Sequence, residues 1–208
     1  MYKRREETKK LLQDAVSAEQ VRMIRTNLES VMDNHSALFM VTSPTQEGEN
    51  SIISSKLAIS FVEQGKKVLL VDANIRKPSI HNWFQIQNDS GLSDVVLNED
   101  NIHLHTKQTF VPGLVVLPTG PIPNNLTDIW VTSKIKKLVD HCGSEFEVVI
   151  FNAPPFLTVS DSHILANQCD GVILVVKENR TKKADLIQTK ENLEMMNNQI
   201  LGVIYQTA

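Results

Sequence analysis

Residues 37–64 read ALFMVTSPTQEGENSIISSKLAISFVEQ, and this stretch decides the fold. It begins with a short apolar run, Ala37–Val41, which predicts a strand buried on both faces of a parallel sheet. A polar loop follows, and apolar residues at helical spacing then predict a helix over Ser51–Gln64. Strand, loop and helix in this order indicate the first half of a βαβ unit.

The same alternation continues along the rest of the chain. Further apolar runs predict strands at Lys67–Val71, Leu114–Leu117, Val148–Phe151, Val172–Val176 and Ile200–Tyr205. Helical spacing predicts helices over Glu19–Asp33, Asn125–His141, Asp161–Gln168 and Thr181–Asn198. These elements predict an α/β fold, a doubly wound, mostly parallel sheet flanked by helices. In such sheets ligands bind beyond the carboxyl ends of the strands.

Length and composition narrow the class of protein. A chain of 208 residues predicts one domain, which we place at residues 17–208 after a basic, flexible N-terminal segment at residues 1–16. Lys and Arg number 21 against 24 Asp and Glu, a net charge of −3, which argues against nucleic acid as the partner. No apolar run approaches the ~20 residues of a membrane span. We therefore expect a cytoplasmic protein.

The loop after the first strand lies where phosphate-binding loops lie, because backbone N–H groups and the helix dipole there receive an anion. Ser51 stands where such a loop places its metal-binding hydroxyl, but Asn50 stands at the lysine position. Glu47 and Glu49 stand where glycines are expected. A lysine about 4 Å from a phosphate contributes roughly 4 kcal/mol at an effective dielectric near 20. A neutral hydrogen bond from Asn50 contributes about 1 kcal/mol, so the sequence predicts a weakened cradle.

Two further polar residues follow predicted strands. Asp72 ends the second strand, where an acid serves as a metal-water ligand or a base, or alternatively caps the next turn. Asn152 ends the fourth strand; an acid there would complete a magnesium site, but an amide cannot balance the ion's charge. Asp72 is therefore the residual catalytic candidate, and Ser51 with Asp72 the candidate for a weakly held metal.

The helix near the N-terminus has one apolar face, formed by Val21, Ile24, Leu28 and Val31. Glu19, Arg22 and Arg25 lie outside that face, on a charged flank. Spacing alone favours an ordinary ion-paired surface for these three residues, worth about 0.2–0.5 kcal/mol per pair.

Seven short segments in fixed order carry a resemblance that covers Ser17 to Gln206. They are residues 19–27 (EQVRMIRTN), 64–72 (QGKKVLLVD), 76–78 (RKP), 91–95 (GLSDV), 119–125 (TGPIPNN), 153–155 (APP) and 201–203 (LGV). Together they resemble the bacterial tyrosine kinase family of capsule and exopolysaccharide systems, the CpsD/CapB-like branch of the MinD-type P-loop proteins.

The resemblance implies a kinase that uses ATP and Mg²⁺, on a P-loop fold, within a ring-shaped homo-oligomer. Its Glu-x-x-Arg-x-x-Arg element, which builds that ring, matches Glu19, Arg22 and Arg25. It also implies a transmembrane chain-length regulator as activator, and hence a peripheral position at the inner face of the cell membrane. The nucleotide-binding positions that it implies are Gly48, Glu49, Asn50, Ser51, Ile52, Asn74, Arg76, Asn152 and Gln206.

The chain departs from the family at each nucleotide motif. Besides the changes in the first loop, Asn74 replaces the second acid of the second motif, Asn152 replaces the acid of the third, and Gln206 stands where an Asn often contacts adenine. Tyr2 and Tyr205 are the only tyrosines, so the usual tyrosine cluster is absent. We therefore expect a pseudokinase with no cofactor, a regulatory or scaffold component of polysaccharide export.

Two alternatives remain open. In the first, the chain is a residual ATP-dependent tyrosine kinase, with Asp72 and Ser51 in the site and Lys56, Lys66 or a neighbouring subunit's basic group in place of the missing lysine. In the second, the basic N-terminus makes it a MinD-like membrane-surface switch. An inward-pointing Glu47 or Glu49 would favour loss of nucleotide binding. Trp83 is expected to pack in a satellite core.

Overall fold

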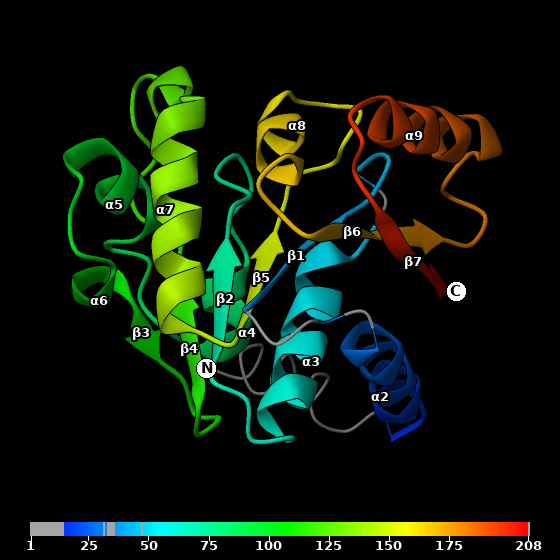
Figure 1. Ribbon diagram of the computed structural model, residues 1–208, viewed down its shortest axis with the longest axis horizontal. Coiled ribbons are helices and arrows are strands. Elements are labelled where there is room, and N and C mark those ends of the chain that lie inside the picture. Colours follow the sequence, from blue (N-terminus) through cyan, green and yellow to red (C-terminus); the bar gives the residue numbers. More distant parts are fainter. Residues whose placement is uncertain (1–14, 31, 33–35, 47, 208) are drawn as a thin grey trace.

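The computed structural model describes the whole chain except residues 1–14, 31, 33–35, 47 and 208. Its centre is a seven-stranded sheet in the order β3-β4-β2-β5-β1-β6-β7 (Figure 1). All neighbouring strands run parallel except β3 and β4, which pair antiparallel. The strands are β1 (Ala37–Thr42), β2 (Val68–Asp72), β3 (Lys107–Gln108), β4 (Leu114–Leu117), β5 (Val148–Asn152), β6 (Gly171–Lys177) and β7 (Ile200–Gln206).

Helices cover both faces of the sheet and bury its alternating side chains. One face packs against α2 (Ala15–Glu29), α3 (Asn50–Val62) and α4 (Ile80–Phe84). The other packs against α5 (Leu92–Asn98), α6 (Ile102–His105), α7 (Thr132–Glu145), α8 (Asp161–Ala166) and α9 (Lys183–Met195). In β1, for example, Phe39 and Val41 belong to the first layer and Met40 to the second.

The predicted fold class is confirmed, and each predicted strand is present. The predicted helix over Glu19–Asp33 instead spans Ala15–Glu29, and the one over Asn125–His141 begins with a separate 3-10 turn, η1 (Leu126–Asp128), before α7. The short elements β3, α4, α5 and α6 were not predicted, because segments of two to seven residues carry too little periodicity. No helix in the described part of the chain is long and apolar enough to cross a membrane.

The parallel register brings four polar strand ends to one edge of the sheet. Thr42, Asp72, Asn152 and Lys177 are the last residues of β1, β2, β5 and β6. Asp72 and Asn152 are direct register partners in neighbouring strands, and Val41 pairs with Asn152 on its other side. Residues 80 positions apart in sequence thus meet at the edge where doubly wound sheets bind ligands.

Candidate functional site

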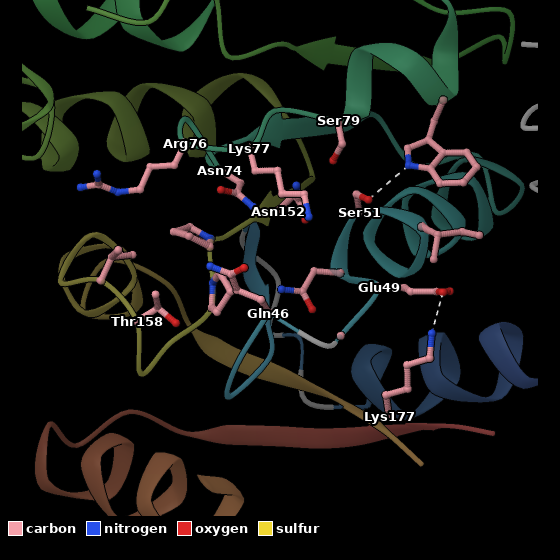
Figure 2. Close-up of a pocket in the computed structure, with 17 residues that line it drawn as sticks. Gln46, Glu49, Ser51, Asn74, Arg76, Lys77, Ser79, Asn152, Thr158 and Lys177 are labelled. Carbon is pink, nitrogen blue, oxygen red and sulfur yellow. Dashed lines mark hydrogen bonds and ion pairs between the residues drawn. The ribbon is translucent and has the colours of Figure 1, made fainter. Parts of the chain in front are cut away.

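A cavity of about 580 Å³ lies beyond this edge of the sheet (Figure 2). Eight of the nine predicted nucleotide-binding residues line it: Gly48, Glu49, Asn50, Ser51, Ile52, Asn74, Arg76 and Asn152. The ninth, Gln206, does not line it but hydrogen-bonds to Glu49, which does. The sequence thus located the cavity; what its residues do there depends on their contacts.

Asp72 lies beneath the cavity, fully buried, and both of its carboxylate oxygens already have donors. Oδ2 accepts from the backbone N–H groups of Ser79, at 2.8 Å, and Ile80, at 3.0 Å. Oδ1 accepts from the Asn74 backbone N–H at 3.3 Å and from Asn152 Nδ2 at 2.9 Å. Burial raises the pKa of Asp72 above its ordinary value, against the opposing effect of these hydrogen bonds. Of the two roles predicted for Asp72, the geometry matches the cap of the following turn.

Two amide oxygens around the cavity have no hydrogen-bond partner among the described residues. Asn152 donates its Nδ2 to Asp72, which leaves its Oδ1 buried and unpaired. Asn50, at the lysine position, donates over 3.3 Å to the Ala153 carbonyl, and its Oδ1 is also buried and unpaired. Gly48 closes over it: a Cβ added to Gly48 would meet that Oδ1 at 2.9 Å. Both oxygens are buried, so they do not meet a ligand directly; each is an unsatisfied acceptor beside the cavity, which costs stability.

Glu49, the residue before the first turn of α3, holds an internal ion pair. Its Oε1 lies 2.9 Å from Lys177 Nζ at the end of β6, as the dashed line in Figure 2 marks. Gln206 on β7 secures the same residue: its Oε1 accepts from the Glu49 backbone N–H at 3.2 Å, and its Nε2 donates to Glu49 Oε2 at 3.4 Å. Glu49 is thus the residue that precedes α3, but its carboxylate is turned to Lys177 and Gln206 and makes no capping hydrogen bond to the N–H groups of the helix. Its negative charge still lies near the amino end of α3, where it opposes an anionic ligand.

Ser51 is also engaged within the chain. Trp83 Nε1 donates a hydrogen bond to Ser51 Oγ over 3.2 Å, and the indole lines the cavity. The expectation that Trp83 only fills a satellite core is corrected in part: it packs against one core layer and also borders the cavity. A serine oxygen that accepts from an indole has one lone pair fewer to offer a metal.

Cationic side chains border the cavity on the side of the β2–α4 loop. Arg76 Nε lies 3.4 Å from Asp161 Oδ2, a buried carboxylate whose pKa burial raises and Arg76 lowers. Lys77 lines the cavity as an exposed side chain, with no acidic partner among the residues that the structure describes. Three cationic side chains therefore line the cavity: Arg76, which is paired with Asp161, Lys177, which is paired with Glu49, and Lys77.

The donor set does not fit a magnesium ion. Magnesium prefers carboxylate and water oxygens in octahedral geometry, and both oxygens of Asp72 are already occupied by donors. Asn152 turns its amino group to Asp72, and Ser51 accepts from Trp83. Among the described residues no group of three or more His, Cys, Asp or Glu is placed to hold a metal.

The predicted ring-forming triplet on α2 divides into two kinds of residue. Glu19 and Arg22 are exposed and pair with each other at 2.6 Å. Arg25 is buried: its Nη1 donates to Ser60 on α3, to the carbonyl at 2.8 Å and to the hydroxyl at 3.0 Å, and its Nε lies 3.2 Å from Glu29. Arg25 thus joins α2 to α3 within the chain, which corrects its assignment to the charged surface flank.

Comparison with known proteins identifies the family. No protein-family model matches the chain. It is 36% identical over 191 residues to the tyrosine-protein kinase YwqD of Bacillus subtilis, covering 91% of this chain and 81% of that one. It is 32% identical over 197 residues to CpsD of Streptococcus agalactiae, covering 94% and 84%. The chain belongs to the bacterial tyrosine kinase family.

Solved structures place this bacterial tyrosine kinase relative in the same fold. The chimerical protein CapA2B2 is 30% identical, with a TM-score of 0.85 over 93% of this chain and 85% of that one. The kinase domain of Escherichia coli ETK has a TM-score of 0.86 at 26% identity, over 92% and 75%. The chain spans only 26% of full-length Etk. MinD of Pyrococcus horikoshii, 16% identical with a TM-score of 0.70 over 82% of this chain and 70% of that one, shares the fold.

Sequence reasoning missed several cavity residues, most importantly Lys177. It searched the residues after β1, β2 and β5 but not those after β6, although the same rule applies there. The suggested substitute cations lie elsewhere: Lys66 pairs with Glu147 at 3.0 Å, and neither Lys66 nor Lys56 lines the cavity. Trp83 and Lys77 follow Asp72 closely in sequence, but only the turn into α4 brings them to Ser51 and the cavity.

Proposed function

We propose that this chain is a catalytically depleted member of its family, a pseudokinase that acts as a regulatory or scaffold component of capsular or exopolysaccharide production. The observation that carries the proposal is the Asp72–Asn152 pair, in which an amide donor occupies a carboxylate that magnesium would otherwise need. The internal Glu49–Lys177 ion pair supports it, because a fixed carboxylate at the start of α3 opposes a triphosphate. Contacts that oppose magnesium or phosphate binding occur at the ends of separate strands. This supports a role that requires the fold but not the kinase reaction.

The proposed partners follow from the family rather than from the cavity. They are other copies of this chain, in a ring, and a transmembrane chain-length regulator at the inner face of the membrane. Glu19 and Arg22, exposed on α2, are the residues available for contact with a neighbouring subunit. Light scattering of the wild type and of Arg22→Ala measures the assembly: a smaller mass for the variant at unchanged melting temperature supports the ring contact.

Phosphotransfer is the direct test of the pseudokinase proposal. Labelled ATP with Mg²⁺ and a tyrosine-bearing protein is given to the wild type, to Asp72→Ala and to Lys77→Met, with an active relative as the positive control. We expect the wild type to label no more than the variants do. Lys77 is exposed, so its variant keeps the test valid if Asp72→Ala does not fold. Wild-type labelling well above both variants contradicts the proposal.

One observation favours the alternative, a residual ATP-dependent tyrosine kinase. Lys177 and Lys77 supply positive charge to the cavity from positions other than the missing lysine. In that case labelling should fall in Lys77→Met and Lys177→Met but persist in Lys66→Met, whose side chain pairs with Glu147 away from the cavity.

A further inference from the structure

The edge strand β7 has one open side. It is the last strand of the sheet, and β6 is its one neighbour among the described strands (Figure 1). The Gln206 carbonyl accepts from the Glu178 N–H on the β6 side. Because backbone groups alternate along a strand, Val203 and Tyr205 direct their N–H and C=O groups away from β6, toward the open side.

The open side of β7 lacks the features that keep edge strands from pairing with another chain. Those features are charged side chains, prolines and bulges. Residues 199–207, QILGVIYQT, contain no charged residue and no proline. The irregularity in the β6–β7 pairing lies between Val172 and Ile173, and the register is regular from Gly202 to Gln206. The carboxyl half of β7 is therefore a regular, uncharged template for a further strand.

A groove of about 570 Å³ lies between β7 and α9, beside this open edge. Its apolar lining residues are Leu174, Leu186, Ile187, Ile200 and Val203. Ile187 is 45% exposed and Val203 is 52% exposed. Tyr205, two residues after Val203 and so on the same face of the strand, is 59% exposed. Large apolar side chains exposed beside an unpaired strand indicate an interaction surface.

The stripe of α9 along the groove has charges that complement a second copy of itself. Ile187, Lys190 and Glu194 line the groove, and Lys183 shares their stripe because the four residues are spaced by four, three and four positions. All four side chains are exposed. When two such stripes lie antiparallel, the Lys183 end of one meets the Glu194 end of the other. This charge pattern favours a second copy of the chain as the occupant.

We propose that β7 pairs antiparallel with β7 of a second copy of this chain, around a twofold axis at Ile204 that joins the two sheets into one. Pairing about Ile204 sets Val203 opposite Tyr205 of the second copy, so their outward N–H and C=O groups bond to each other. An aromatic residue opposite a β-branched one stabilises such a pair. The same axis sets Lys183 opposite Glu194 of the second copy. This contact differs from the proposed ring contact on α2 and goes beyond the proposed function.

Sedimentation velocity of the full chain over a range of concentrations tests the proposal. It is carried out in the Arg22→Ala background, so that failure of the ring contact and failure of this contact are distinguishable. We expect a monomer–dimer equilibrium, and Val203→Lys should raise its dissociation constant at least about ten-fold, because it buries a charge in the new strand pair. The matched control is Leu104→Lys on α6, where an apolar side chain 73% exposed lies outside the groove. It should leave the dissociation constant unchanged.

Two charge variants in the same background test the twofold arrangement of α9. Lys183→Glu places two acids across the axis, and Glu194→Lys places two lysines there, so each variant alone should dimerise more weakly. In a dimer with one copy of each variant, both contacts again join opposite charges. An equimolar mixture should therefore recover dimers that neither variant forms alone at the same total concentration.

Cross-linking tests the position of the axis independently of the mass. In antiparallel pairing about Ile204, this residue meets its own copy in a non-hydrogen-bonded pair, whose Cα atoms are about 4.5 Å apart, within the range of a disulfide. Ile204→Cys should form a covalent dimer on oxidation. Met195→Cys is the control, since it is exposed on α9 but far from the axis. The wild type, with Cys142 and Cys169, is the blank.

Four outcomes overturn the inference. They are a chain that stays monomeric because another segment covers the edge or because the edge does not pair, a dimer that Val203→Lys leaves intact, a mixture that dimerises no better than its components, and no cross-link at residue 204. Val203, Lys183 and Glu194 are exposed, so their variants are expected to fold. The pseudokinase proposal is independent of these outcomes, because it is decided by phosphotransfer of the wild type.

Discussion

Asn152 donates a hydrogen bond from Nδ2 to Asp72 Oδ1 over 2.9 Å, at the end of β5 where it pairs in register with β2. With an acid at residue 152, two buried carboxylates would face each other across this distance. Such a pair needs a cation or a shared proton, because both groups cannot ionise side by side. The amide supplies the positive end of a dipole instead, so the bare site is stable without a metal.

Asn152→Asp should therefore destabilise the chain when magnesium is absent. Both side chains are at most 1% exposed, so the free energy of unfolding in EDTA should fall by about 3 kcal/mol, as for an uncompensated buried charge. Mg²⁺ at millimolar concentration should restore part of the loss, because it can bridge the two carboxylates. Urea denaturation of wild type and variant, each with EDTA and with Mg²⁺, measures both effects.

The surface offers a matched control for this substitution. Asn98 donates to Asp100 over 3.3 Å in an exposed position, so Asn98→Asp creates the same pair of acids in water. Its cost should stay below about 0.5 kcal/mol and should not depend on Mg²⁺. Equal costs at the two positions would show that burial of the Asp72–Asn152 pair has no special effect.

Asp72 should make the folded chain less stable as pH rises, the reverse of the usual effect of a carboxyl group. Its pKa in the folded chain is raised by burial above the ordinary value of 3.8, so the folded state binds the proton more tightly than the unfolded state. The stability that this residue contributes is therefore present below pH 3.8 and falls as pH rises to the folded pKa, above which it is constant. The difference in unfolding free energy between wild type and Asp72→Asn, measured against pH, should follow this direction.

Asp89 should have the opposite effect on the pH dependence of stability. Its pKa is lowered by the hydrogen bond from Lys107, so its contribution is present above the ordinary value of 3.8 and is lost as pH falls through the lowered pKa. Asp89→Asn should therefore differ from the wild type in the reverse sense. Profiles of the same sign for both variants would contradict the assignment of burial as the dominant influence on Asp72.

Arg25 and Arg22, three residues apart on α2, should respond differently to alanine. Arg25→Ala should cost about 2–3 kcal/mol, because it leaves the Ser60 carbonyl without its charged donor and removes a buried contact between α2 and α3. Arg22→Ala should cost less than about 0.5 kcal/mol, since its pair with Glu19 is exposed. Guanidinium denaturation distinguishes the two. A larger loss of unfolding free energy in Arg22→Ala than in Arg25→Ala would contradict the assignment of Arg25 as the buried residue and Arg22 as the exposed one.

The sequence predicted the fold and the location of the cavity better than it predicted the hydrogen bonds and ion pairs of the side chains there. Buried parallel strands are read from their apolar runs, and polar residues at their ends mark the cavity. The partners of individual side chains cannot be read from apolar runs and strand ends. Glu49 and Lys177 are 128 positions apart in sequence, and Asp72 and Asn152 are 80 positions apart. The charge at residue 25 gave no sign of burial, because a long arginine can cover apolar surface and still reach a carbonyl.

If the pseudokinase proposal holds, the family's motif residues introduced into this chain should confer magnesium-dependent nucleotide binding. Glu47→Gly, Glu49→Gly, Asn50→Lys and Asn152→Asp together introduce the cation, the two loop glycines and the second acid that the family resemblance implies. A lysine near a phosphate contributes roughly 4 kcal/mol at an effective dielectric near 20 before desolvation, so Mg·ATP affinity should rise at least about 100-fold. Thermal shift with Mg·ATP against ATP in EDTA measures it.

The same combination without Asn50→Lys isolates the contribution of the lysine. Asn50 makes one long hydrogen bond, to the Ala153 carbonyl, and its Oδ1 is unpaired, so replacing it removes little that stabilises the folded chain. The three-residue variant, with both loop glycines but no lysine, should bind Mg·ATP weakly, because the helix amino end alone lacks a cation opposite the phosphates. If the full combination folds and still does not bind, the cause lies in the backbone of the loop rather than in the side chains at positions 47, 49, 50 and 152.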